Sequence, residues 1–247
     1  MNSHQTTLGG LACRVVDALP PEANPELVVI LCHGFGASGT DLVPLVPEIL
    51  ALDPGLEAKI RFVFPAAPLS LDEIGMVGAR AWWHLDVQKL AMAVEQGNLR
   101  ILRNEIPDGL EAARDSLMTL VAELKRSTGL PTSRFVLGGF SQGAMLATDV
   151  ALRLDDSPSG LGIFSGTLLC EEQWRELAAK RGTLHVFQSH GRLDPLLPFQ
   201  ASEWLRDLFL DSGMQVDFVP FDGMHEIPAV ALHRFTALLG TLADEML

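Results

Sequence analysis

The sequence predicts an α/β fold: a mostly parallel, doubly wound sheet with helices on both faces. Short apolar runs alternate with longer helix-compatible segments along the 247 residues, and such a repeating βα order favours parallel strands. The runs are continuously apolar, which suits strands covered on both faces. Because single α/β domains often reach about 200–250 residues, we expect one domain over residues 1–247.

The apolar runs define the expected strands. An early run, Leu11–Val16, precedes the turn-forming segment Pro20–Pro25, and we place it at the sheet edge, with residues 1–26 forming an edge strand and an N-terminal extension. The other strands are expected at Leu27–Leu31, Ile60–Phe64, Phe135–Leu137, Leu161–Phe164, Leu184–Gln188 and Val216–Val219.

The segments between these runs are the expected helices. Apolar residues from Ile106 to Leu124 form one stripe with charged residues opposite, which is typical of a helix that covers a sheet. Segment Asp86–Asn104 has no clear period; it fits a flexible flap or an ordinary helix with a turn, and we favour the helix because long unstructured loops are uncommon. The helices are expected at Asp41–Ala51, Pro107–Ser127, Gly143–Leu154, Glu171–Lys180, Pro198–Asp211 and Pro228–Glu245.

Composition excludes several classes of protein. No apolar stretch approaches the roughly 20 residues that span a bilayer, and the N-terminus lacks the basic and apolar regions of a secretory signal, so a cytoplasmic location is expected. The net charge of −13 repels phosphate backbones, which argues against a nucleic-acid partner. This charge also gives no reason to expect a large self-associating surface, and the oligomeric state stays open.

Cysteine and histidine spacing gives no sign of a metal site. Cys13, Cys32 and Cys170 lie far apart without a C-x-x-C motif, and the seven histidines form neither H-x-x-x-H nor H-E-x-x-H. We therefore expect reduced, mostly buried thiols and no metal.

The most informative motif is G-x-S-x-G around Ser141, between an apolar run and a helix-compatible run. This is the layout of a nucleophile elbow, a sharp turn that exposes a serine hydroxyl. Gly139 and Gly143 are expected where a Cβ atom would collide with a neighbouring strand or helix. The motif alone also fits an ordinary glycine-rich turn, so the partners of Ser141 decide its meaning.

A serine nucleophile needs a base and a carboxylate that orients the base. In this fold class both follow the serine, the acid before the histidine, on loops after later strands. Asp194 follows the strand Leu184–Gln188, and His225 follows the strand Val216–Val219. We therefore expect Ser141 as nucleophile, Asp194 as orienting acid and His225 as base.

Other polar residues are weaker candidates for these roles. His190 precedes Asp194, the wrong order for the base, and we interpret it as a hydrogen-bonded loop residue. Asp222 fits a turn, and His33 is expected to be a structural hydrogen-bonding residue.

Acyl transfer also needs donors for the oxyanion. The glycine-rich segment Leu31–Gly39 follows an early strand, so the backbone N–H of Phe35 can face the pocket, together with that of Gln142 beside the nucleophile. The same segment also fits a plain strand-to-helix turn, but it lacks the Gly-Lys-Ser/Thr of a phosphate loop.

Six short motifs follow one another along residues 27–240: Leu31–Gly36, Phe64–Pro68, Ala81–Trp83, Gly138–Ala144, His190–Asp194 and Gly223–Glu226. Together and in this order they resemble the phospholipase/carboxylesterase family of α/β hydrolases, which includes the acyl-protein thioesterases. The resemblance implies the α/β-hydrolase fold, the roles given above to Ser141, Asp194, His225, Phe35 and Gln142, and no cofactor.

The resemblance implies hydrolysis of a carboxylic ester through an acyl-enzyme on Ser141. The substrate would be a small-molecule or lipid ester, or an acylated protein. Alternatives are an acyl-protein thioesterase or an acyltransferase with the same triad, and a non-catalytic binding protein of the same fold.

Ala81–Asp86 resembles the family's Ala-Trp-aromatic-Asp segment, but here His84 and Leu85 stand between the aromatic residue and Asp86. This departure leaves the choice of substrate open. Trp82 and Trp83 fit either an acyl pocket or the core. We assign both to the candidate substrate pocket and expect one of the two indoles to line it, since two adjacent indoles rarely share one buried environment.

Overall fold

The computed structural model describes residues 1–85, 92, 103–104, 106–182 and 184–245. An eight-stranded sheet runs in the order β1-β2-β4-β3-β7-β8-β9-β10. The six strands from β4 to β10 in this order are parallel, whereas β1 and β2 are antiparallel to their neighbours. The strands are β1 (Asn2–Leu8), β2 (Leu11–Asp17), β3 (Leu27–Cys32), β4 (Ile60–Pro65), β7 (Phe135–Phe140), β8 (Gly160–Phe164), β9 (His185–Gly191) and β10 (Gln215–Phe221).

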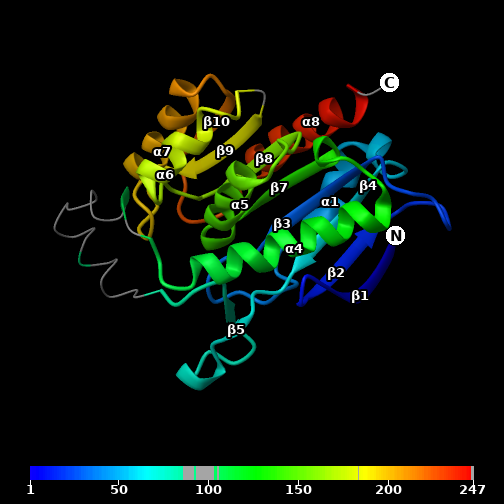
Figure 1. Ribbon diagram of the computed structural model, residues 1–247, viewed down its shortest axis with the longest axis horizontal. Helices are drawn as coiled ribbons and strands as arrows, with labels where there is room; N and C mark the ends of the chain where they lie inside the picture. Colours follow the sequence, from blue (N-terminus) through cyan, green and yellow to red (C-terminus); the bar gives the residue numbers. More distant parts are fainter. Residues whose placement is uncertain (86–91, 93–102, 105, 183, 246–247) are drawn as a thin grey trace.

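Helices cover both faces of this sheet, and Figure 1 shows α4 and α5 lying across one of them. A short hairpin of β5 (Leu69–Ser70) and β6 (Arg80–Ala81) forms a separate two-stranded sheet. The α-helices are α1 (Leu45–Leu52), α4 (Leu110–Thr128), α5 (Gln142–Arg153), α6 (Glu171–Ala178), α7 (Phe199–Asp211) and α8 (Ala229–Asp244), and the 3-10 helices are η1 (Pro54–Leu56), η2 (Asp72–Ile74) and η3 (Thr132–Arg134).

Two apolar cores lie on opposite faces of the sheet. One core packs α4, α5, α6 and α7 against the strands, with Leu117 and Trp174 buried in it. The other packs α1 and α8, and Phe235 of α8 contacts the rings of Phe164 and Phe187. The predicted mostly parallel sheet with helices on both faces is therefore confirmed.

The prediction for the sheet edge is wrong. Leu11–Val16 does form a strand, β2, but β1 pairs outside it and occupies the edge. The residues of β1 are mostly exposed and polar, so no apolar run marks this strand in the sequence. The prediction for Asp86–Asn104 lies outside the described residues except Met92, Arg103 and Asn104. In the part of the chain that the structure describes, no helix is long and apolar enough to cross a membrane.

The carboxyl ends of the parallel strands position the candidate site. Cys32 ends β3, Phe140 ends β7, Gly191 ends β9 and Phe221 ends β10. Ligands of open α/β sheets bind outside these strand ends. The loops that follow these strands carry the polar residues singled out in the sequence.

Candidate active site

Ser141 lies at a strained turn between β7 and α5. Its φ of 54° and ψ of −119° fall in a region that non-glycine residues rarely adopt. Its N–H donates to the carbonyl oxygen of Phe164 on the neighbouring strand, at 2.8 Å. The strained turn of a nucleophile elbow, which the sequence predicts, is present.

The two glycines of the elbow let it approach β3 closely. A Cβ atom on Gly139 would lie 2.4 Å from the carbonyl oxygen of Cys32, and one on Gly143 would lie 2.1 Å from the same oxygen. Both separations are far below a van der Waals contact. The predicted collision with a neighbouring strand is confirmed, and the elbow is wedged against the end of β3.

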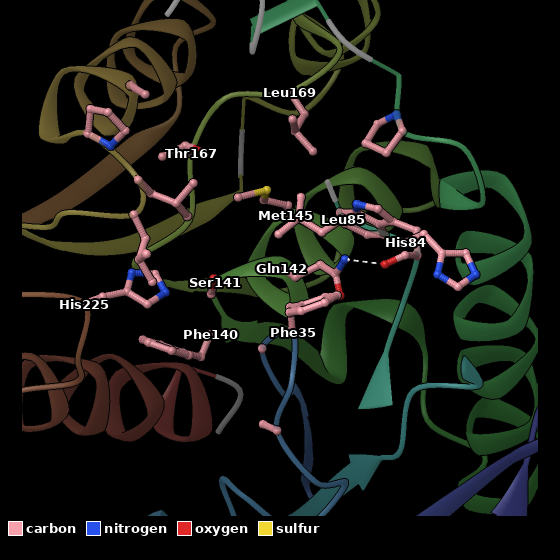
Figure 2. Close-up of a pocket in the computed structure, with 18 of the residues that line it drawn as sticks. Phe35, His84, Leu85, Phe140, Ser141, Gln142, Met145, Thr167, Leu169 and His225 are labelled. Atoms are coloured by element: carbon pink, nitrogen blue, oxygen red, sulfur yellow. Dashed lines mark hydrogen bonds between the residues drawn. The ribbon is translucent and has the colours of Figure 1, made fainter. Parts of the chain in front are cut away.

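Asp194 and His225 meet across the loops after β9 and β10. The Nδ1–H of His225 donates to Oδ2 of Asp194 at 2.6 Å. Backbone hydrogen bonds from Arg192 to Phe221 and from Leu193 to Gly223 join the two loops. The His225 ring packs 4.7 Å from the ring of Phe140, between centroids, and it faces the same cavity as Ser141 (Figure 2).

The carboxylate of Asp194 is fully buried and held as an anion. Burial by itself raises the pKa of this carboxyl group, but hydrogen bonds from His190, His225 and the Leu197 amide outweigh that effect and hold the pKa far below its usual value. Its Oδ1 atom accepts the N–H groups of Leu196 and Leu197, each at 2.9 Å. An ionised carboxylate at this position can orient an imidazole and stabilise its charged form.

The glycine-rich loop after β3 is fixed by His33. The backbone N–H of Ala67 donates to Nε2 of His33 at 3.0 Å, so Nδ1 carries the proton and donates to the carbonyl oxygen of Gly34 at 2.8 Å. Burial lowers the pKa of His33, as expected for a neutral structural histidine. In the part of the chain described, the N–H of Phe35 has no acceptor, and Phe35 lines the cavity.

The side chain of Gln142 makes hydrogen bonds to a distant segment, a role that sequence reasoning missed. As the first residue of α5 it has no acceptor for its N–H within the helix. Its buried side chain bridges to another segment: Oε1 accepts the N–H of Trp82, and Nε2 donates to the carbonyl oxygen of Trp83, both at 2.9 Å. The dashed line in Figure 2 marks the second bond. In the sequence, the only sign of this bridging role is that a polar side chain follows Ser141 directly.

The cavity above Ser141 has a volume of about 720 Å³. Trp83 lines it, whereas Trp82 is absent from the described lining and donates its Nε1–H to the carbonyl oxygen of His33 at 2.8 Å. The assignment of Trp82 to the pocket is therefore wrong, and of these two adjacent indoles Trp83 is the one that lines the cavity. Most of the described lining is apolar, including Phe35, Leu85, Met145, Leu169, Leu196 and Leu197.

The described residues give little support for a metal centre or for a cysteine nucleophile. Within the described residues, no group of three His, Cys, Asp or Glu side chains gathers as metal ligands would. The three cysteines are buried, and burial raises the pKa of Cys13 to about 12 and of Cys170 to about 11. Thiols with such pKa values stay protonated at neutral pH and are poor nucleophiles.

Comparison with known proteins agrees with the geometry. Residues 14–242 match the model of the family described as Phospholipase/Carboxylesterase. Acyl-protein thioesterase 1 of Eremothecium gossypii is 34% identical over 179 residues, which cover 70% of this chain and 68% of that protein. Acyl-protein thioesterase 1 of Neurospora crassa is 26% identical over 223 residues, covering 88% and 86% of the two chains.

A solved structure extends the similarity to the whole fold. The crystal structure of esterase PE8 superposes with a TM-score of 0.74 at 25% identity and covers 98% of this chain and 100% of its own. This superposition over nearly the whole chain, together with the family match, confirms the predicted α/β-hydrolase fold.

Proposed function

Because this chain belongs to the phospholipase/carboxylesterase family of serine ester hydrolases, we propose that Ser141 is its nucleophile, His225 its general base and Asp194 the acid that orients the base. The observation that carries the proposal is the 2.6 Å hydrogen bond from His225 to the buried Asp194 carboxylate, with His225 and Ser141 lining one cavity. This is the arrangement by which a weakly nucleophilic hydroxyl is activated.

The first half-reaction forms an acyl-enzyme. The Ser141 Oγ atom attacks the carbonyl carbon of the ester while His225 takes the hydroxyl proton, and Asp194 stabilises the resulting imidazolium. The carbonyl oxygen becomes an oxyanion, which accepts the N–H groups of Phe35 and Gln142. The intermediate collapses, the bond to the leaving oxygen breaks, and His225 returns its proton to the alcohol.

The second half-reaction releases the acid. Water attacks the acyl carbon and gives one proton to His225, and the intermediate again collapses, this time with Ser141 as leaving group. His225 then protonates the Ser141 oxygen. The ester and one water molecule thus become a carboxylic acid and an alcohol, and the enzyme is restored.

The direct kinetic test measures hydrolysis of p-nitrophenyl esters. Ser141→Ala is expected to lower kcat by about a million-fold, while Ser127→Ala, an exposed serine on α4, retains wild-type turnover. Turnover that survives in folded Ser141→Ala protein would exclude Ser141 as nucleophile. Absence of turnover in folded wild-type protein, with no labelling by a fluorophosphonate, would favour a binding protein.

A second candidate activity is thioester hydrolysis. The relatives at 34% and 26% identity are named acyl-protein thioesterase 1, and the apolar lining of the cavity suits an acyl chain. Acyl thioesters and p-nitrophenyl esters of the same graded chain lengths would be compared by kcat/KM. A higher kcat/KM for the thioesters at every length would make thioester hydrolysis the main activity.

The substrate class and the setting are also proposed. The apolar cavity and the names of the relatives support a lipid ester or an acylated protein as substrate. We propose a cytoplasmic location, supported by the thiols of Cys13 and Cys32, which are buried and form no disulfide. One domain over residues 1–247 is proposed because a single eight-stranded sheet contains strands from both ends of the chain.

A further inference from the structure

We propose that His190 is a positioning residue for the hydrolytic reaction: its ring fixes the Asp194 carboxylate in the orientation that receives His225. The inference rests on the proposed function, because it gives His190 a role only through the pair Asp194–His225. Sequence order argues against His190 as the base, and its position in the fold gives it this different task.

The contacts of His190 converge on the turn that carries Asp194. Its Nε2 atom lies 2.7 Å from the carbonyl oxygen of Leu197 and 3.3 Å from Oδ2 of Asp194. The side chains of His190 and Asp194 are both 0% exposed. Because both neighbours of Nε2 are acceptors, this nitrogen carries a proton and shares it between them.

The other ring nitrogen makes no comparable contact. The Nδ1 atom of His190 is buried and has no hydrogen-bond partner among the described residues. An unsatisfied buried polar atom costs about 1–3 kcal/mol, so an apolar side chain of similar size would suit a purely structural position better. What the imidazole supplies at this position is the Nε2–H group directed at Asp194 and Leu197.

The three residues form a closed set of hydrogen bonds. Leu197 donates its N–H to Oδ1 of Asp194 and accepts the Nε2–H of His190 on its carbonyl oxygen. His190 also approaches Oδ2, the oxygen that accepts the Nδ1–H of His225. Rotation of the carboxylate would break contacts on both of its oxygens, so His190 and Leu197 together hold Oδ2 toward His225.

The fold makes His190 a rigid support for this set. His190 lies on β9, which pairs with β8 and β10 on its two sides, whereas Asp194 lies on the loop after this strand. The ring of Phe199, at the start of α7, packs 6.2 Å from the His190 ring between centroids. The Asp194 carboxylate, on a loop, is thus hydrogen-bonded to His190, a strand residue whose own position is fixed by packing. Such support keeps a reacting group in place.

The test uses three variants that differ in where a donor remains. His190→Gln keeps an N–H donor near the position of Nε2, His190→Asn moves the donor to the position of Nδ1, and His190→Met removes it. For each variant we would measure kcat and KM for p-nitrophenyl butyrate, the thermal midpoint Tm, and the far-downfield 1H NMR resonance of the His225 Nδ1 proton.

We expect the Met and Asn variants to lose about 10- to 100-fold in kcat at unchanged KM, and to lose or broaden the His225 resonance. The Gln variant should keep both the resonance and most of kcat, which a merely structural role would not require. Equal kcat values and equal resonances in the Gln and Asn variants would overturn the proposal, as would wild-type behaviour of a folded Met variant.

If Ser141 were not the nucleophile, the kinetic experiment would show it separately from the test of His190. In that case wild type and Ser141→Ala would show equal turnover. The resonance of the His225 proton does not depend on turnover, so its comparison between the Gln and Asn variants would still decide whether His190 positions Asp194.

Discussion

The Nδ1 atom of His225 lies 2.6 Å from Oδ2 of Asp194, although 31 residues separate the two in sequence. The contact follows from the topology, because β9 and β10 are parallel neighbours and their following loops leave the same edge of the sheet. Any variant that shifts one loop relative to the other should therefore act on this hydrogen bond.

Gln142→Ala is expected to weaken both stability and catalysis. The substitution keeps the backbone N–H but leaves the buried N–H of Trp82 and carbonyl of Trp83 without their partner. The free energy of unfolding should fall by about 1–3 kcal/mol, measured by urea denaturation, and kcat/KM should fall with it. Gln200→Ala, on the exposed face of α7, is the control; equal effects of the two variants would contradict a bridging role for Gln142.

Gly143→Ala is expected to disrupt the elbow. The added Cβ atom would lie 2.1 Å from the carbonyl oxygen of Cys32 and 2.4 Å from that of His33, and backbone on both sides leaves no flexible group to move. The free energy of unfolding should fall by about 3 kcal/mol or more, with loss of esterase activity.

Gly182→Ala provides the matched control for this substitution. Its nearest neighbour would be the carbonyl oxygen of Ser212 at 3.9 Å, so the free energy of unfolding should change by less than about 1 kcal/mol. A stable, active Gly143→Ala protein would show that the elbow does not need close approach to β3.

The stability of the protein should depend on pH through Asp194. Its pKa is lowered in the folded state, so its stabilising contribution is complete above the unfolded pKa of about 3.9 and disappears as pH falls toward the lower folded pKa. Urea denaturation of wild type and Asp194→Asn should give a stability difference in which the wild-type protein loses its advantage as pH falls below about 5. A difference independent of pH down to the acid-unfolding limit would contradict a lowered pKa.

Trp83→Phe should change the preference for acyl-chain length. Trp83 lines the cavity, so a smaller ring leaves more room and should move the maximum of kcat/KM toward longer p-nitrophenyl esters. Trp82→Phe is the paired control, since it removes the hydrogen bond to His33 without changing the described lining. It should lower Tm and leave the chain-length profile as in wild type; the same shift in both variants would exclude Trp83 as a determinant of length.

Sequence alone could predict the elements whose signals are local. Ser141 stands in a motif whose glycines are needed for close packing, and Asp194 and His225 follow apolar runs in a fixed order. The main strands and helices were predictable for the same reason, because continuous apolar runs and a 3.6-residue period are read directly from neighbouring residues.

Features that depend on long-range contacts could not be predicted in this way. The polar strand β1 is defined by pairing with β2. Which indole enters the cavity depends on the bonds that Gln142 and His33 make to Trp82 and Trp83. The contacts of His190 exist only because the chain turns back at Leu197.

The most direct test of the account is to identify the residue that a fluorophosphonate modifies. Intact-protein mass spectrometry followed by peptide mapping of the folded wild-type protein should find a single adduct, on Ser141, and none in Ser141→Ala. Labelling should be slowed strongly in His225→Ala, because the base that activates the hydroxyl is then missing. An adduct on another residue, or an active wild-type protein that remains unlabelled, would contradict the assignment of Ser141 as the nucleophile.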